Sequence, residues 1–163
     1  MQKVDFLTPI GRLVIIGDKQ AIHSVQFEDG DTLLDPYHED LASEVAKAYQ
    51  ELTAYFEGTG KEFTFQLEPQ TGTPFQREVW ESLKTIPYGE TGSYLQIAST
   101  INRPKAVRAV GGANGKNPFT VVLPCHRIIG ASGKMVGYTG GLWRKEWLLA
   151  HEQKFKEASI KTY

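Results

Sequence analysis

Residues 93–113 read SYLQIASTINRPKAVRAVGGA, and this stretch decides the fold that we expect. It begins with a helix start signal, in which Ser93 is followed three residues later by Gln96. A break at residues 102–104 separates this first short helix from a second, basic helix over residues 105–113. Two short helices joined by a tight turn are typical of a helix-turn-helix, although many helical hairpins share the pattern.

The charges differ sharply between the two parts of the chain. Residues 1–70 carry 13 acidic and 5 basic side chains, whereas residues 71–163 carry 6 acidic and 13 basic ones. Residues 91–145 contain eight Lys or Arg and no Asp or Glu. Because a solvated surface usually mixes both signs, this stretch predicts a polyanionic partner, with nucleic acid the first candidate. A basic lobe that docks on the acidic one is the alternative.

We expect two lobes, residues 1–70 and residues 71–163. In the first lobe, residues 13–16 and 23–27 have the pattern of short strands, and residues 63–67 alternate in the same way. Residues 41–56 have apolar side chains at helical spacing. No residue of this lobe suggests chemistry, so we expect it to be structural.

The second lobe follows a linker at residues 68–72. Its first helix has a strong start signal, with Thr73 as N-cap and Gln76 completing a capping box. Residues 119–123 form a short apolar run, which predicts a strand that delivers the cysteine. A final amphipathic helix is expected from Leu142 to about Lys154.

The chain contains a single cysteine. One cysteine forms neither an internal disulfide nor a cysteine-rich zinc site, which favours a reducing compartment. No apolar run approaches the roughly 18 residues of a membrane helix, and no apolar segment follows the charged N-terminus. We therefore expect a cytoplasmic protein without a membrane partner.

The cysteine lies within Pro124-Cys125-His126-Arg127. A thiol is a weak nucleophile until it is deprotonated, and the two following basic residues predict a positive field that favours the thiolate. Neighbouring residues on a strand point to opposite faces, but a turn after Pro124 could return the imidazole toward the sulfur. Glu152 is the carboxylate that we expect to orient the imidazole ring.

Residues 122–129, VLPCHRII, resemble the active-site signature of the O6-alkylguanine-DNA alkyltransferases, also called methylated-DNA–protein-cysteine methyltransferases. The resemblance is dense over residues 73–152, whereas the first lobe is similar only in size, order of elements and position. Further motifs agree in register: Pro87-Tyr88-Gly89, Ser93-Tyr94, Arg108 to Ala113, Asn117-Pro118 and Glu146 to Glu152.

The resemblance implies an α/β (α+β) fold, with a ribonuclease-H-like first lobe and a helical second lobe that carries a winged-helix-like helix-turn-helix. It implies direct-reversal DNA repair, in which an alkyl group leaves O6-alkylguanine, or O4-alkylthymine as a second substrate, and stays on Cys125. Each molecule would act once, as a monomer, on double-stranded DNA, with no cofactor and no metal.

The resemblance also implies a role for each matching residue. Cys125 would accept the alkyl group, His126 would take its proton through a water molecule, and Glu152 would orient the ring. Arg108 would fill the gap left by the extruded nucleotide, and Tyr94 would help to rotate the target phosphate. The other residues on the DNA side would be Gly111, Gly112, Ala113 and Arg127, and the base pocket would include Tyr94, Asn117, Ile128, Tyr138 and Thr139.

Three other functions stay open on the sequence. A helix-turn-helix regulator explains the basic lobe but gives Cys125 no task. A cysteine hydrolase explains a Cys–His–Glu set but not the stretch without carboxylates. A damage sensor without catalytic activity would bind the same lesion and would need no thiol.

Overall fold

The computed structural model describes residues 1–130, 137, 138 and 140–158, with the side chains of the last two left out. The chain divides into two compact units. The first contains Met1–Thr71 and the short segment Pro118–Val122, and the second contains Gly72–Asn117 and the chain from Leu123 onward. None of the helices in the described part of the chain is long and apolar enough to span a membrane.

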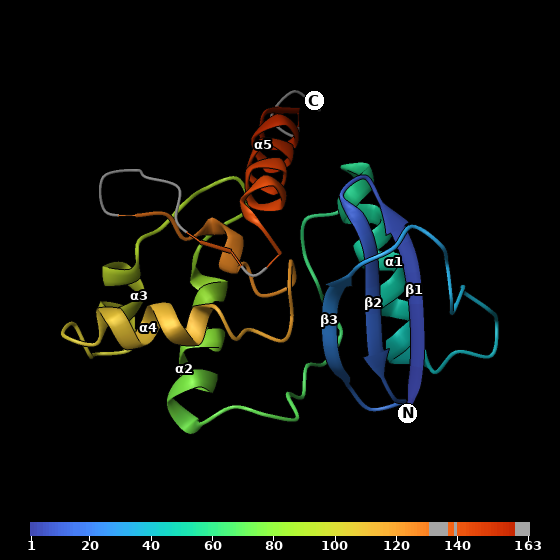
Figure 1. Ribbon diagram of the computed structural model, residues 1–163, viewed down its shortest axis with the longest axis horizontal. Helices are drawn as coiled ribbons and strands as arrows, with labels where there is room; N and C mark the ends of the chain where they lie inside the picture. Colours follow the sequence, from blue (N-terminus) through green and yellow to red (C-terminus); the bar gives the residue numbers. More distant parts are fainter. Residues whose placement is uncertain (131–136, 139, 159–163) are drawn as a thin grey trace. The chain divides into compact units, whose positions relative to one another are not determined.

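The first unit is an antiparallel sheet of three strands with one helix against it (Figure 1). The strands β1 (Gln2–Thr8), β2 (Gly11–Gly17) and β3 (Ile22–Glu28) follow one another in chain order. Val4, Ile15 and Val25 are cross-strand neighbours, all fully buried, so they form one row of the core. The helix α1 (Ser43–Glu57) packs its apolar side against the sheet.

The strand β1 was not expected from the sequence, because Asp5 interrupts its apolar pattern. Asp5 is buried nonetheless, since its carboxylate accepts from Arg12 at 3.3 Å and from the amides of Leu34 and Asp35 at 3.0 and 3.1 Å. A buried carboxylate is tolerated where charge and hydrogen bonds compensate it, so Asp5 can occupy the face opposite Val4.

The prediction of a strand at residues 63–67 is wrong. The described structure has only an isolated bridge there, between Ile22 and Leu67. The alternating aromatic side chains pack on one another and on α1 instead. The Phe63 ring lies 5.8 Å from the Tyr55 ring and 5.9 Å from the Phe65 ring, measured between ring centroids. Their spacing therefore reflects an aromatic cluster beside α1.

The second unit is helical, and its first helix, α2 (Pro74–Ser82), begins as expected. Thr73 caps it in a complete capping box with Gln76. A short 3₁₀ turn, η1 (Leu83–Thr85), continues it. The Trp80 indole donates to the Ala113 carbonyl at 2.8 Å, which ties α2 to the helix-turn-helix.

The predicted helix-turn-helix is confirmed as α3 (Tyr94–Thr100) and α4 (Val107–Asn114). Ser93 caps α3 by accepting from the Gln96 amide at 3.0 Å. The second helix starts two residues later than expected, because the Ala106 amide closes a turn on Arg103. The last helix, α5, covers Leu142–Ala158.

The strand predicted at residues 119–123 is also wrong. Only Phe119 bridges to Val25, and the chain then turns at Val121, which has a φ of 74°. A β-branched residue rarely adopts this left-handed conformation, which is incompatible with an extended strand. The cysteine is therefore delivered by a turn.

Candidate functional site

Two consecutive tight turns present Cys125. Pro124 has φ −79° and ψ 63°, the geometry of an inverse γ-turn, and the Cys125 amide donates to the Leu123 carbonyl at 2.7 Å. A single 3₁₀ turn, η2 (Cys125–Arg127), follows. Proline suits this position because its ring fixes φ. Because the cysteine lies in a turn, the strand rule that separates adjacent side chains does not apply to its neighbours.

Hydrogen bonds anchor these turns on both sides. Upstream, the buried Asn117 side chain donates from Nδ2 to the Leu123 carbonyl at 2.8 Å. Downstream, the Gly92 amide donates to the Arg127 carbonyl and the Ile129 amide donates to the Gly92 carbonyl, both at 2.9 Å. The position of Cys125 is thus set by contacts on either side of η2.

His126 and Glu152 form a fully buried pair. The Nε2 atom of His126 lies 2.7 Å from Oε2 of Glu152. Burial lowers the pKa of His126 although Glu152 attracts its proton, so the ring is neutral near pH 7. The carboxylate accepts a hydrogen bond from Nε2–H, which leaves Nδ1 as the basic nitrogen. Among the described residues, Nδ1 has no hydrogen-bond partner.

Arg127 was expected to contact DNA, and the structure corrects this. Its side chain is buried, with Nε and Nη2 donating to the two Glu152 oxygens at 2.8 and 3.0 Å. Nη1 donates to the Ile86 carbonyl at 2.7 Å. All three nitrogens are engaged inside the unit, so Arg127 holds Glu152 in place.

Glu152 is therefore surrounded by donors. Besides His126 and Arg127, the Gly89 amide donates to Oε1 at 3.2 Å. Burial by itself would raise the pKa of this carboxyl, but His126 and Arg127 outweigh burial and hold the pKa below its usual range. The carboxylate stays ionised and fixes the imidazole ring.

The thiol environment differs from the expected positive field of His126 and Arg127. Burial raises the pKa of Cys125, while Asn117, Lys145 and Tyr138 act in the opposite direction. His126 is neutral and the charge of Arg127 is directed at Glu152. The positive charge that favours the thiolate comes from Lys145.

Lys145 is a site residue that the sequence interpretation missed. Its side chain is fully buried on α5, and its ammonium group donates to the Ile128 carbonyl. Burial lowers its pKa, whereas Cys125 raises it. The sequence did contain a signal, because Lys145 lies at helical spacings of three and four on the same face as Leu148 and the predicted site residue Glu152.

Two tyrosines interact electrostatically with Cys125. Burial raises the pKa of Tyr94, and Cys125 adds to this effect. Burial and Cys125 together raise the pKa of Tyr138 well above its usual value. Both phenols therefore keep their protons at neutral pH and are available as donors. Thr139, which we placed in the same pocket, lies outside the described residues.

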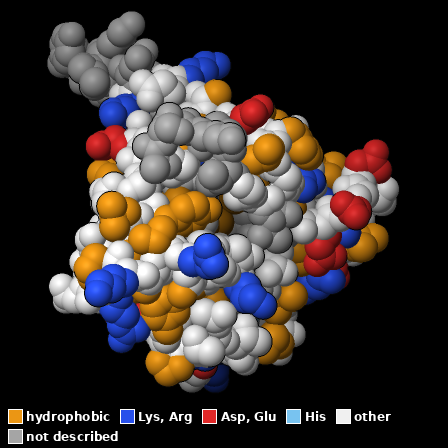
Figure 2. All heavy atoms as spheres, turned by 60° about the vertical axis from the view of Figure 1, so that its left-hand side comes forward, with side chains coloured by type: hydrophobic (Ala, Val, Ile, Leu, Met, Phe, Trp, Pro, Cys, Tyr) orange, Lys and Arg blue, Asp and Glu red, His pale blue; other side chains and the backbone are white. Residues whose placement is uncertain are grey.

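The exposed face of α4 is open and basic. Arg108 is exposed, and Gly112, one turn later, would meet nothing within 4 Å if it carried a Cβ. A Cβ on Gly111 would only touch the Tyr94 ring, at 3.8 Å. Figure 2 brings this side of the second unit forward and shows Lys and Arg side chains among apolar ones.

Ala113 does not belong to that exposed face. Its side chain is buried, and its carbonyl accepts from the Trp80 indole. The Ala113 side chain is therefore not on the surface where we expected it to contact DNA.

Two family models match the chain. The model described as 6-O-methylguanine DNA methyltransferase, DNA binding domain, matches residues 74–154, and that of the ribonuclease-like domain matches residues 6–69. A Methanosarcina acetivorans protein named methylated-DNA–protein-cysteine methyltransferase is 45% identical, over 90% of this chain and 95% of its own length. A Mycolicibacterium paratuberculosis protein of the same name is 46% identical, over 94% and 93%.

Solved structures agree with the sequence matches. The Mycobacterium tuberculosis O6-methylguanine methyltransferase has a TM-score of 0.81 at 40% identity, covering 94% of this chain and 93% of that one. A structure of the Mycobacterium tuberculosis protein in complex with DNA has a TM-score of 0.83 at 41% identity, covering 95% and 94%.

The buried carboxylate yields a prediction about stability. Glu152→Gln should lower the free energy of unfolding by about 3–5 kcal/mol, because it leaves the buried Arg127 guanidinium without a counter-charge. Chemical denaturation at pH 7 measures this, with the exposed Glu146→Gln on the same helix as the control, expected to change it by less than about 0.5 kcal/mol.

The same carboxylate predicts an acid dependence. A pKa below the usual 4.5 means that Glu152 contributes its full stabilisation above pH 4.5 and loses it as the pH falls through the folded value. The difference between the wild-type protein and Glu152→Gln should therefore shrink in acid. A difference that stays constant down to pH 2 would contradict this assignment.

Proposed function

We propose the following mechanism from the premise that the chain belongs to the 6-O-methylguanine DNA methyltransferase family. As a member, the chain is a DNA-repair methyltransferase that transfers an alkyl group from DNA to its own cysteine. The sequence contains one cysteine, so Cys125 is the acceptor that we propose.

The neutral imidazole of His126, the residue that follows Cys125 in the chain, is the observation that carries this mechanism. A general base must accept the thiol proton. Nδ1 of His126 can do so, because the hydrogen bond to Glu152 keeps the proton of the neutral ring on Nε2. We assign the proton transfer from sulfur to Nδ1 to a bridging water. The thiolate then attacks the alkyl carbon, forming a C–S bond as the C–O6 bond breaks, and the displaced guanine anion takes back, through water, the proton that His126 had accepted.

The tyrosines and Lys145 assist this displacement. The raised pKa values of Tyr94 and Tyr138 keep both phenols protonated, so each can donate a hydrogen bond to a nucleobase within the pocket. The buried Lys145 ammonium stabilises negative charge on sulfur before the attack. Asn117 supports the turn that carries the sulfur.

DNA is the partner, and we assign α4 to its minor groove. O6 of guanine cannot be reached in line within a duplex, so the nucleotide must leave the stack. Arg108 would fill the vacancy. The open backbone at Gly111 and Gly112 lets the helix lie close to the duplex, while the basic segment supplies phosphate contacts without sequence preference.

The remaining assignments are also proposals. The lesion would be O6-alkylguanine in double-stranded DNA, with O4-alkylthymine as a second substrate. The second unit holds every proposed acceptor and DNA residue, which supports a working monomer and a structural role for the first unit. A single thiol that must stay reduced supports the cytoplasm as location.

The stoichiometry of repair tests this function. Incubation with excess duplex containing one O6-methylguanine should stop at one lesion per protein molecule, with the protein heavier by one methyl group on the Cys125 peptide. Intact and peptide mass spectrometry measure both. Cys125→Ser should bind the same duplex but transfer nothing, because serine is far less nucleophilic.

Sustained turnover with unchanged protein mass would refute single use. Binding without any mass change in the wild-type protein would instead indicate a damage sensor.

Arg108→Ala should separate base extrusion from chemistry. At saturating DNA we expect repair of duplex to slow by about 10- to 100-fold, since extrusion costs a few kcal/mol and the vacancy is no longer filled. Reaction with free O6-benzylguanine should not change. Lys105→Ala, which removes an exposed charge from the same motif, should reduce affinity but not the rate at saturation. Equal losses on both substrates would contradict the role of Arg108.

Gly112→Ala should improve stability and impair function. An alanine in the helix is favoured by about 0.8–1.0 kcal/mol over glycine, and its methyl group enters open space. The same methyl should hold the duplex away and weaken DNA binding. Denaturation and duplex titration measure the two effects, with Gly115→Ala at the end of α4 as control. Unchanged affinity would show that DNA does not approach this backbone.

A further inference from the structure

A buried histidine also lies in the first unit. His23 on β3 is 6% exposed. Its Nε2 atom lies 2.9 Å from Oδ2 of Asp18, on the turn between β2 and β3. Its Nδ1 atom lies 2.9 Å from the Glu68 carbonyl and 2.8 Å from Nε2 of Gln70. The ring thus joins the sheet to the start of the segment that leads into α2.

We propose that His23 is a proton-operated clamp, which holds the segment Glu68–Gln70 on β3 when its ring is doubly protonated and loosens it as the pH rises.

The backbone around His23 shows what the clamp holds. The Ile22 amide donates to the Gln66 carbonyl and the Glu68 amide donates to the Ile22 carbonyl, both at 2.8 Å. These two bonds form the isolated bridge at Leu67. A single bridge is a weak attachment, so the side-chain contacts of His23 add to how firmly the segment is held.

The clamp has two states, which differ in whether the His23 ring carries one proton or two. In the imidazolium both nitrogens donate, Nε2 to Asp18 and Nδ1 to the Glu68 carbonyl, and the Gln70 amide presents its oxygen. In the neutral ring, Nε2 keeps its proton for Asp18, so Nδ1 becomes an acceptor. It can then accept from the Gln70 amide nitrogen, but its lone pair faces the Glu68 carbonyl oxygen and that bond is lost.

The charges around the ring favour the protonated state. The charged groups that act on His23 are Asp18 on the β2–β3 turn and Glu68 on the linker segment, and both are acidic. The hydrogen bond to Asp18, then that to the Glu68 carbonyl, raises the pKa of His23 above 6.5. The same bond lowers the pKa of Asp18 to about 2. A raised pKa means that the stabilisation is complete below pH 6.5 and is lost as the pH rises through the folded value.

The first test is a titration of the unmodified protein. NMR of the His23 ring should give a pKa above 6.5, and the Asp18→Asn variant should lower it. A wild-type pKa at or below 6.5 would overturn the proposal, whatever the variants do.

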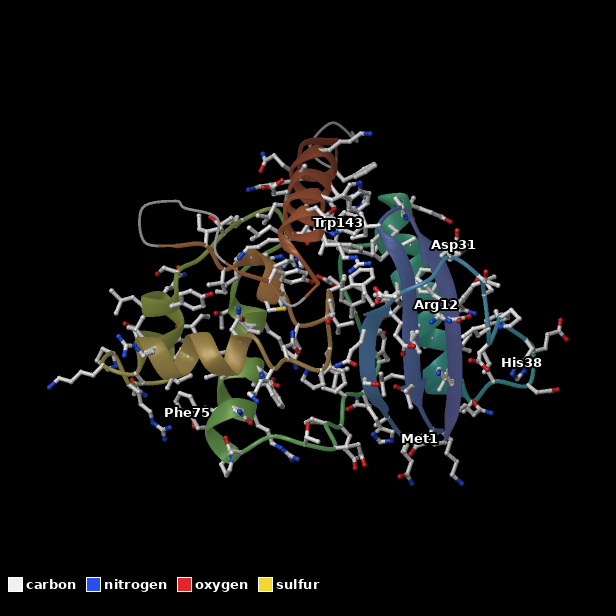
Figure 3. The ribbon with its side chains drawn as sticks, in the orientation of Figure 1. Met1, Arg12, Asp31, His38, Phe75 and Trp143 are labelled. Atoms are coloured by element: carbon white, nitrogen blue, oxygen red, sulfur yellow. The ribbon has the colours of Figure 1, made fainter. Side chains whose placement is uncertain are left out.

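The second test follows the linker segment. The Glu68 amide should exchange its hydrogen faster in His23→Gln than in the wild-type protein at pH 6, and the ratio should fall toward one at pH 9. The melting temperature of the wild-type protein should likewise exceed that of His23→Gln by more at pH 6 than at pH 9. His38, exposed on the loop between β3 and α1 (Figure 3), supplies the matched control His38→Gln, which should behave like wild type. An exchange ratio that does not change with pH would show that protonation of His23 does not hold the segment.

Discussion

The buried carboxylate of Glu152 is the constraint on which the acceptor site depends. A carboxylate without water costs several kcal/mol unless opposite charge and hydrogen bonds replace the water. Here Arg127 supplies the charge, and His126 and the Gly89 amide complete the set of donors. These donors come from η2 and from the turn after η1, whereas Glu152 comes from α5. Satisfying one carboxylate therefore fixes three distant segments and, with them, the position of the sulfur.

The sequence could predict those parts of the fold that short-range signals encode. Capping residues such as Thr73 and Ser93 satisfy backbone amides within three residues, so the starts of α2 and α3 were predictable. Apolar alternation failed where long-range partners decided the outcome. Asp5 concealed β1 because its counter-charge, Arg12, lies on the next strand, and the aromatic residues near Phe63 pack on Tyr55 rather than in a sheet.

In the site, too, the sequence could predict what short motifs encode but not what depends on distant partners. The motif around Cys125 predicted a nucleophile, a histidine and a carboxylate, because the chemistry requires those residue types, and these roles stay predictions. It could not give the direction of Arg127, which depends on the Ile86 carbonyl and on Glu152, both far away in the sequence. Lys145 escaped notice for a related reason. A lysine in a basic stretch suggests a solvated face, and only the packing of α5 shows that this one is buried beside the thiol.

The burial of Cys125 has a consequence for a protein that acts once. An exposed thiolate reacts with oxidants and other electrophiles, and this chain has no second thiol to replace the first. Burial raises the pKa of Cys125 and so favours the unreactive thiol, whereas Lys145 acts in the opposite direction. In the proposed mechanism, His126 is the group that accepts the thiol proton. Deprotonation of the Cys125 thiol can then be coupled to the arrival of the alkylated nucleobase in the pocket. Under the proposed mechanism, this arrangement keeps Cys125 unreacted until its single lesion arrives, because burial and the Lys145 charge act on the thiol within the same site.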